Sequence, residues 1–177
     1  LDKYSGANGQ VNYEANNYEG YGVGGVAVVV ETLTGNKNRT VADVRHLFDK
    51  YGAGLGATNC VSWQFDKKGV IIMERGELDE DTVMMQALEA GAEDFQADEN
   101  TFEIYTTPDD FSAVREALET LGYSFVEAGL EMVPQNYITL ENEGDMAKMR
   151  KLLDNLEDND DVQAVWHNWE NEDDYEG

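Results

Sequence analysis

The sequence contains one cysteine, two prolines and two histidines, and it lacks long apolar runs. A single cysteine, Cys60, excludes an internal disulfide and a zinc site built on several cysteines. With no histidine or second cysteine near it, Cys60 is interpreted as a small core residue rather than a nucleophile. No apolar run reaches about 18 residues and no signal-peptide pattern occurs, so we expect a cytoplasmic protein without a membrane span.

Catalytic motifs are also absent from the sequence. His46 and His167 fall on different expected elements, and no His-Glu-x-x-His, Gly-x-Ser-x-Gly or Ser/His/Asp grouping can be assembled. The acidic run over residues 158–161 lacks the spacing of a calcium loop and is interpreted as solvated. We therefore expect a protein that is not an enzyme and that uses no metal or cofactor.

Acidic residues are abundant, but they are unevenly distributed. The formal net charge is −25, of which residues 1–74 contribute −1, residues 75–135 contribute −14 and residues 136–177 contribute −10. Seven of the 12 Lys and Arg residues lie in the first segment, so an anionic partner is expected to bind there. The acid of residues 75–177 indicates a solubilising shell or, over residues 75–135, a docking surface for a basic protein.

The first 74 residues predict the order β-α-β-β after a polar arm at residues 1–19. A β-branched run predicts a buried strand over residues 24–33. Thr40 as N-cap, an apolar face and Gly52 as a stop predict a helix over residues 40–51. Residues 61–65 and 70–74 predict two strands joined by a hairpin turn at residues 66–69.

The remaining residues again mix helices with short strands. A helix is expected over residues 79–91, with Met84 and Leu88 facing inward, and a second one runs from Thr107 to Gly122. Strands are expected over residues 93–97, 101–106, 123–133 and 137–140. A helix over residues 143–155 and a strand over residues 162–167 close the chain. The methionines on these helices are interpreted as core residues.

This order of elements predicts an α+β fold with two ferredoxin-like domains, one inserted in the other. The β-α-β-β of residues 24–74 lacks the α-β that completes a ferredoxin-like unit, and residues 143–168 supply one. We therefore expect a split domain, residues 1–74 plus 136–177, with residues 75–135 as an inserted acidic domain. Two sequential domains divided near residue 76 are the alternative.

The glycines of residues 20–25 match the string Gly-x-Gly-x-x-Gly. In a dinucleotide site a strand precedes such glycines and a helix follows them, whereas here a polar arm precedes and a valine-rich strand follows. We interpret the glycines as a turn with positive φ, or as points of close backbone approach, that leads into a central strand. This turn is expected near residues 36–39.

A basic segment over residues 36–50 is the best candidate surface, with four basic and two acidic side chains. Arginine and asparagine side chains suit phosphate oxygens, and a helix N-terminus adds positive potential. Two tyrosines expected beside this segment could stack on bases. The candidate nucleic-acid-binding residues are Tyr18, Tyr21, Lys37, Asn38, Arg39, Arg45 and Lys50. A solvated helix with internal ion pairs is the alternative.

Several motifs of the sequence resemble those of the YebC family, over about residues 10–168. They are Tyr18-Glu19-Gly20-Tyr21-Gly22, Asn36-x-Asn38-Arg39-Thr40, Phe65-x-x-Lys68-Gly69 and Asp161-Val162-Gln163 with His167-Asn168. The family includes bacterial proteins named probable transcriptional regulators and a mitochondrial translational activator of cytochrome oxidase. Val23 departs from the pattern, because the family usually has proline there.

The resemblance implies three domains, a basic N-terminal helical bundle and two α+β domains, of which this chain matches only the last two. It implies a non-enzymatic regulatory factor of gene expression, either a DNA-binding transcriptional regulator or a ribosome- or RNA-associated translation factor. Binding to DNA, RNA or the ribosome would then need the absent helical domain. The alternative is an acidic protein-interaction or ligand-sensing module without direct nucleic-acid binding.

Overall fold

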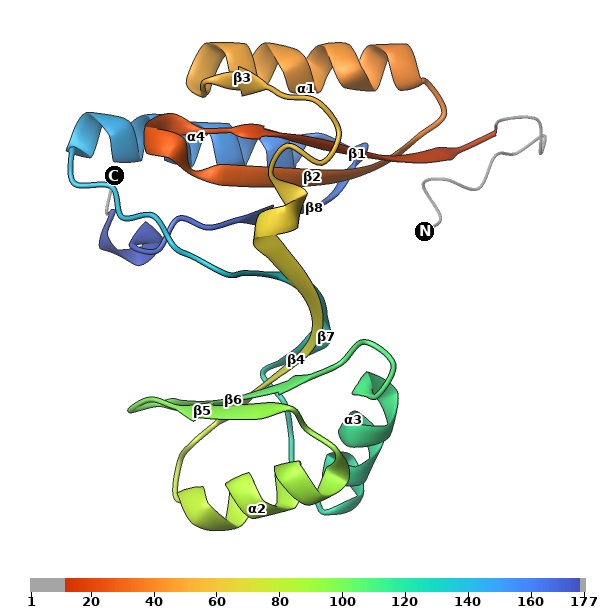
Figure 1. Ribbon diagram of the computed structural model, residues 1–177, viewed down its shortest axis with the longest axis vertical. Helices are drawn as coiled ribbons and strands as arrows, with labels where there is room; N and C mark the ends of the chain where they lie inside the picture. The colour runs from red at the N-terminus through yellow and green to blue at the C-terminus, as the bar shows by residue number, and fades with distance from the viewer. Residues whose placement is uncertain (1–11, 176–177) are drawn as a thin grey trace. The chain divides into compact units, whose positions relative to one another are not determined.

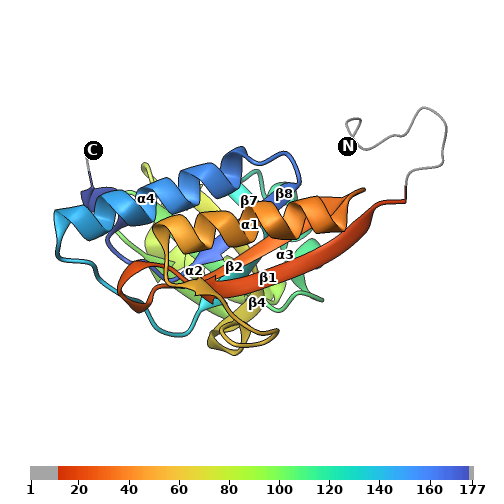
Figure 2. The same cartoon turned by 90° about the horizontal axis from the view of Figure 1, so that it is seen from above.

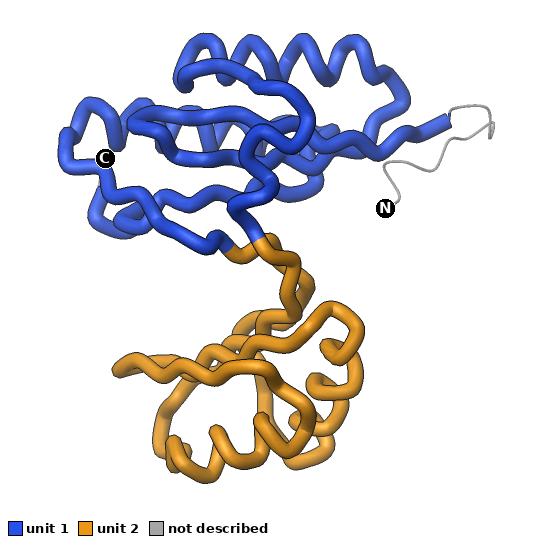
Figure 3. Tube along the Cα trace, in the orientation of Figure 1, with its two compact units in different colours: residues 1–65, 134–177 blue, residues 66–133 orange. Residues whose placement is uncertain are grey.

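The computed structural model describes residues 12–175, which belong to two compact units (Figure 3). Unit 1 contains the chain up to Phe65 and from Pro134 onward, and unit 2 contains Asp66–Val133. Each unit combines a four-stranded sheet with α-helices (Figure 1), which confirms the predicted α+β class. None of the helices described is both long and apolar enough to cross a bilayer.

The sheet of unit 1 has the strand order β3-β1-β2-β8. β1 (Glu14–Tyr21) and β2 (Ala27–Thr34) form an antiparallel hairpin. β8 (Val162–His167) pairs antiparallel with β2, as does the two-residue β3 (Gly54–Leu55) with β1. β2 and β8 confirm two predicted strands.

The strand β1 corrects the prediction of a polar arm over residues 1–19. The asparagines and glycines of this segment have low strand propensity, which favours a loop when the segment is considered alone. In the structure every residue of β1 pairs with one of β2, from Glu14 opposite Thr34 to Tyr21 opposite Ala27. Pairing with a buried valine-rich strand therefore overrides the local preference. The first 11 residues of that predicted arm lie outside the described residues.

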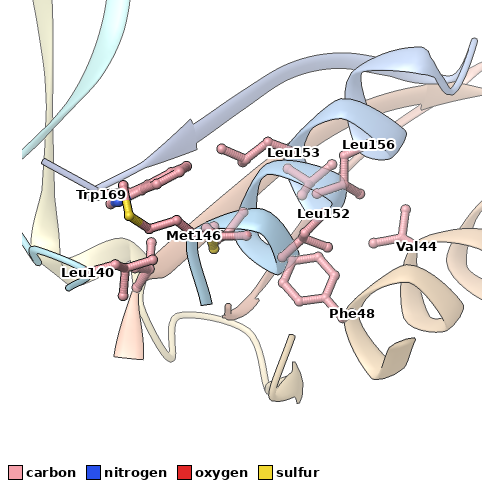
Figure 4. Packing of buried hydrophobic residues seen from close by; sticks show 12 residues of the cluster. Val44, Phe48, Leu140, Met146, Leu152, Leu153, Leu156 and Trp169 are labelled. Carbon is pink, nitrogen blue, oxygen red and sulfur yellow. The ribbon is translucent and has the colours of Figure 1, made fainter. Parts of the chain in front are cut away.

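Two helices, α1 (Lys37–Tyr51) and α4 (Glu143–Asp158), lie side by side on one face of this sheet (Figure 2). Phe48 of α1 and Leu152 of α4 point toward each other in the core between them (Figure 4). Met146 and Met149 are buried in the same core, as predicted for methionines on this helix.

The first turn of α1 begins earlier than the sequence predicted. Asn36, not Thr40, is the N-cap, because its side chain accepts a hydrogen bond from the Arg39 N–H. Thr40 is instead buried inside the first turns, where its hydroxyl donates to Asp161.

Unit 2 has the element order β-α-β-β-α-β and the strand order β5-β6-β4-β7, which is the ferredoxin-like arrangement. The elements are β4 (Phe65–Glu74), α2 (Glu80–Ala90), β5 (Asp94–Ala97), β6 (Thr101–Thr106), α3 (Phe111–Thr120) and β7 (Glu127–Pro134). Its core is separate from that of unit 1 and consists of Ile71, Met73, Val83, Ala87, Phe102, Ile104, Val114 and Leu118.

The strand β4 corrects the predicted hairpin over residues 61–74. Residues 62–64 form a short 3-10 helix, η3 (Ser62–Gln64), and residues 65–74 form one continuous strand. Ile71 and Met73 are buried in the core of unit 2, and β4 pairs with β6 from Gly69 to Glu74. The complete ferredoxin-like unit is therefore residues 65–134, whereas unit 1 has the order β-β-α-β…α-β.

The inward face of α2 also differs from the prediction. Val83 and Ala87 are buried, but Met84 is 36% exposed and Leu88 is 47% exposed. Each residue of a helix is rotated by about 100° from the one before it, so one narrow stripe faces the sheet. On α2 that stripe passes through Val83 and Ala87.

Candidate nucleic-acid interface

The glycines of residues 20–25 form a turn, as predicted. Gly24 and Gly25 have φ values of +66° and +83°, and Gly22 N–H donates to the Val26 carbonyl at 2.7 Å. A Cβ on Gly20 would lie 2.6 Å from the Gly54 carbonyl oxygen and 2.9 Å from the Phe48 ring. These glycines therefore permit a left-handed turn and close contact between β1, β3 and α1.

The location of this turn differs from the prediction that it lies near residues 36–39. The turn precedes β2, and Asn36 follows the other end of the same eight-residue strand. Residues at the two ends of such a strand are about 23 Å apart. Tyr21 lies instead beside the C-terminal end of α1, where Ala53 N–H donates to its carbonyl oxygen at 2.9 Å.

The two candidate tyrosines occupy different environments. Tyr18 is half-buried and packs against the core of unit 1, and its hydroxyl is buried without a hydrogen-bond partner within residues 12–175. Tyr21 is 36% exposed, and its hydroxyl accepts a hydrogen bond from Gln64 Nε2 at 3.4 Å. Of the two rings, Tyr21 is the one that solvent reaches more readily.

Two of the candidate cations at the start of α1 form ion pairs. Lys37 Nζ lies 3.4 Å from Glu14, and Arg39 donates to Asp161 Oδ2 at 2.9 Å. Burial alone would raise the pKa of Asp161, but hydrogen bonds from Arg39 and Thr40 outweigh it and lower that pKa. Asp161 in turn raises the pKa of Arg39. Arg39 therefore ties α1 to the start of β8.

The other candidate cations are exposed along α1. Arg45 forms no ion pair with any residue of the described chain, and the Lys50 ammonium lies 5.2 Å from the centre of the Tyr51 ring. Asn38 is exposed in the first turn. The candidate cations without acidic partners among the described residues thus lie in the middle and at the C-terminal end of α1, whereas those of the first turn are paired.

Sequence reasoning missed an ordered loop beside Tyr21, residues 56–64. One carboxylate, that of Glu19 in β1, accepts hydrogen bonds from the backbone N–H groups of Asn59 (2.9 Å), Val61 (3.0 Å) and Ser62 (2.7 Å). Burial alone would raise the pKa of Glu19, but these hydrogen bonds together outweigh it and lower the pKa. Glu19 therefore holds the loop as an ionised acceptor.

The same loop carries the most exposed large hydrophobic side chain described in the structure. Trp63 is 66% exposed, and its indole N–H donates to the Cys60 carbonyl at 3.0 Å. Burial raises the pKa of the Cys60 thiol, and the charge of Glu19 adds to this effect, so the thiol stays protonated at neutral pH. A tryptophan in an otherwise small and polar loop was the available sequence signal.

The fold places the chain among proteins made of two α+β units. Residues 13–169 match the family described as "TACO1/YebC second and third domain", and the chain belongs to this family. Among residues 12–175, no group of three or more His, Cys, Asp or Glu side chains could hold a metal ion.

Several relatives share more than half of their aligned residues with this chain. A protein of Caldicellulosiruptor saccharolyticus named "Probable transcriptional regulatory protein" is 58% identical over 161 residues, covering 90% of this chain and 66% of its own length. A protein of the same name from Acetivibrio thermocellus is 57% identical, covering 96% of this chain and 70% of its own length. The chain thus spans about two thirds of these curated relatives.

A solved structure with a similar fold comes from Aquifex aeolicus, where the protein is titled "Conserved Hypothetical Protein Aq1575". It is 43% identical to this chain, and the two superpose with a TM-score of 0.77. The match covers 89% of this chain and 65% of that one.

Proposed function

We propose that this chain is part of a non-enzymatic regulatory factor of gene expression that acts in the cytoplasm by contacting DNA, RNA or the ribosome. Family membership and the names of the relatives support a regulatory role. The nucleic-acid contact is inferred from two exposed cations of α1, Arg45 and Lys50. Neither of them forms an ion pair with a carboxylate of the described chain.

The distribution of charge supports unit 1 as the contacting part. Unit 2, residues 66–133, has 18 acidic and four basic side chains and would repel a phosphate backbone. On α1, Arg45 and Lys50 can approach phosphates directly, with Asn38 as an additional donor. Lys37 and Arg39 contribute only if their pairs with Glu14 and Asp161 open. The part of the relatives that this chain does not span would add further contacts.

Salt-dependent binding tests this proposal. The affinity of the full chain for duplex DNA and single-stranded RNA, and its co-sedimentation with ribosomes, are measured over a range of salt concentrations. The slope of log K against log salt is negative, and each lost phosphate contact reduces its magnitude by about one. We therefore expect Arg45→Ala plus Lys50→Ala to reduce the magnitude of the slope by about two. The partner that shows this change identifies a transcriptional or a translational role.

A matched control uses the second helix of the same unit. Lys148→Ala plus Lys151→Ala removes the same charge from exposed positions of α4 and is expected to have a smaller effect. Equal effects of the two double variants would show that binding depends on the net charge of the protein and not on a specific surface of α1. An unchanged slope in the α1 variant would remove α1 from the interface.

A second candidate function is docking of a basic protein on unit 2, as an acidic interaction module. A groove of about 770 Å³ between α2 and α3 favours it, because its lining combines the small apolar side chains of Ala90, Ala113 and Ala117 with the carboxylates of Glu89 and Glu116. A basic amphipathic helix has matching chemistry. Glu89→Lys plus Glu116→Lys should abolish capture of such a partner while leaving nucleic-acid affinity at least as high. Unchanged capture would exclude the groove.

A further inference from the structure

Trp63 is the most exposed large hydrophobic side chain among residues 12–175. Its ring is 66% accessible, so a partner that covered it would remove apolar area from water. Trp63 is the middle residue of η3, which directly precedes β4 in the chain. It makes no part of either hydrophobic core.

The loop beneath the ring is held in place before any partner arrives. Glu19 fixes the backbone at residues 59, 61 and 62, and the Trp63 carbonyl oxygen accepts a hydrogen bond from Gln135 Nε2 at 3.2 Å. The indole N–H is fixed to Cys60. Because the loop is already fixed, it loses little conformational entropy when a partner covers the ring, so the binding site is preorganised.

The geometry of the ring favours a stacking partner. Buried interface tryptophans usually use the indole N–H to bind their partner, but in Trp63 this group is already occupied within the loop. The ring therefore offers a partner mainly its π faces. Every nucleobase has a complementary face, and stacking on an aromatic side chain contributes about 1–3 kcal/mol per base.

The surroundings of the ring are suitable for a polyanion. Residues 51–65 contain no charged side chain, although the protein as a whole carries a net charge of −25. The nearby Glu19 carboxylate is 6% exposed and turned inward to the loop backbone. Tyr21 supplies a second partly exposed ring, connected to this loop through Gln64. Within residues 51–65 a phosphate backbone therefore meets no acidic side chain.

We propose that Trp63, together with the partly exposed Tyr21 that Gln64 contacts, is a stacking site for unpaired nucleobases. The site gives the protein a preference for single-stranded nucleic acid, or for bases extruded from a duplex, over fully paired duplex. Stacking tolerates different bases because it reads no hydrogen-bonding edge. This inference rests on the proposed function, since it concerns how the same protein selects the form of nucleic acid that it binds.

Fluorescence and affinity measurements on the full chain test the stacking site. The probes are a single-stranded oligouridylate, a single-stranded oligoadenylate and an RNA duplex of equal length. We expect the single strands to quench tryptophan emission and to bind more tightly than the duplex. Trp63→Ala should remove most of the quenching and weaken single-strand binding roughly tenfold, with little change in duplex binding. Trp63→Phe should keep most of the affinity.

The control is Tyr137→Ala, which removes another exposed aromatic ring of unit 1 and should leave binding unchanged. Unchanged single-strand affinity in Trp63→Ala, with reduced affinity in the Arg45→Ala plus Lys50→Ala variant, would overturn the stacking site and leave the proposed function standing. Loss of ribosome binding in Trp63→Ala, with unchanged affinity for both single strands, would also overturn the stacking site, because the ring would then act without contacting unpaired bases. Absence of any nucleic-acid binding by the unmodified chain would overturn both proposals.

Discussion

At the scale of single residues, a buried glutamate holds the conformation of the loop that carries Trp63. Glu19 is 6% exposed, and its carboxylate accepts hydrogen bonds from three backbone N–H groups of the loop. Hydrogen bonds to a charged group contribute about 1.5–3 kcal/mol, so this residue stabilises the loop more than a neutral acceptor would. The position of Trp63 thus depends on the charge of a residue in β1.

We predict that Glu19→Gln lowers the free energy of unfolding at neutral pH by about 1.5–3 kcal/mol. The folded pKa of Glu19 lies below its ordinary value, so its contribution is full above a pH of about 4.3 and is lost as the pH falls through the folded pKa. The difference between the two proteins in denaturant unfolding should therefore shrink in acid. Glu14→Gln, which breaks an exposed ion pair with Lys37, should cost less than about 1 kcal/mol. A Glu19→Gln effect that does not vary with pH would contradict this account.

The residues of this loop show why the sequence alone did not locate the site. Tyr21 and Trp63 are 42 positions apart in the numbering, and Gln64, the residue after Trp63, donates a hydrogen bond to the Tyr21 hydroxyl. From the sequence we expected Tyr21 beside the basic segment of residues 36–50, because few residues separate them in the chain. A strand of eight residues separates them in space, since a short sequence distance along an extended strand is a long physical one.

At the scale of elements, local signals predicted the helices well and the strand partners poorly. α2, α4 and β8 follow from periodicity and capping residues, because these act within a few positions. β4 was placed in the wrong sheet, since nothing within residues 65–74 states whether β6 or β2 is its neighbour. β1 was missed because its stability comes from β2 rather than from its own composition.

The start of α1 depends on a contact between distant elements. Asp161, at the start of β8, is 8% exposed and accepts from Arg39 and from the Thr40 hydroxyl. Two sequence motifs that seemed separate, one around residues 36–40 and one around residues 161–168, therefore form a single cluster. Arg39 has a structural role here that the basic composition of its segment did not reveal.

We predict that Asp161→Asn lowers the free energy of unfolding by about 1.5–3 kcal/mol, because it removes the charge from a buried acceptor of two hydrogen bonds. Arg39→Ala should destabilise the unmodified chain and have little further effect in the Asp161→Asn background. Denaturant unfolding of the two single variants and the double variant measures this coupling. Additive effects of the two substitutions would show that Arg39 is not held by Asp161.

At the scale of the whole chain, the two units meet the requirements of separate folding domains. Each has its own sheet and its own core. The two chain crossings lie together, because Gln135 N–H donates to the Gln64 carbonyl oxygen at 2.8 Å. Both ends of unit 2 therefore leave unit 1 at neighbouring points, which is the usual geometry of a tolerated insertion.

We predict that residues 64–135 fold alone and that unit 1 folds when residues 66–133 are replaced by a short glycine-rich turn. The isolated ferredoxin-like unit should show cooperative thermal unfolding and dispersed amide resonances, because all six of its elements and its core are retained. A fragment cut at the boundaries expected from the sequence, residues 75–135, lacks β4 and with it Ile71 and Met73, so it should remain unfolded. Cooperative folding of that shorter fragment would show that β4 belongs to the split domain after all, and failure of residues 64–135 to fold would show that unit 2 depends on unit 1.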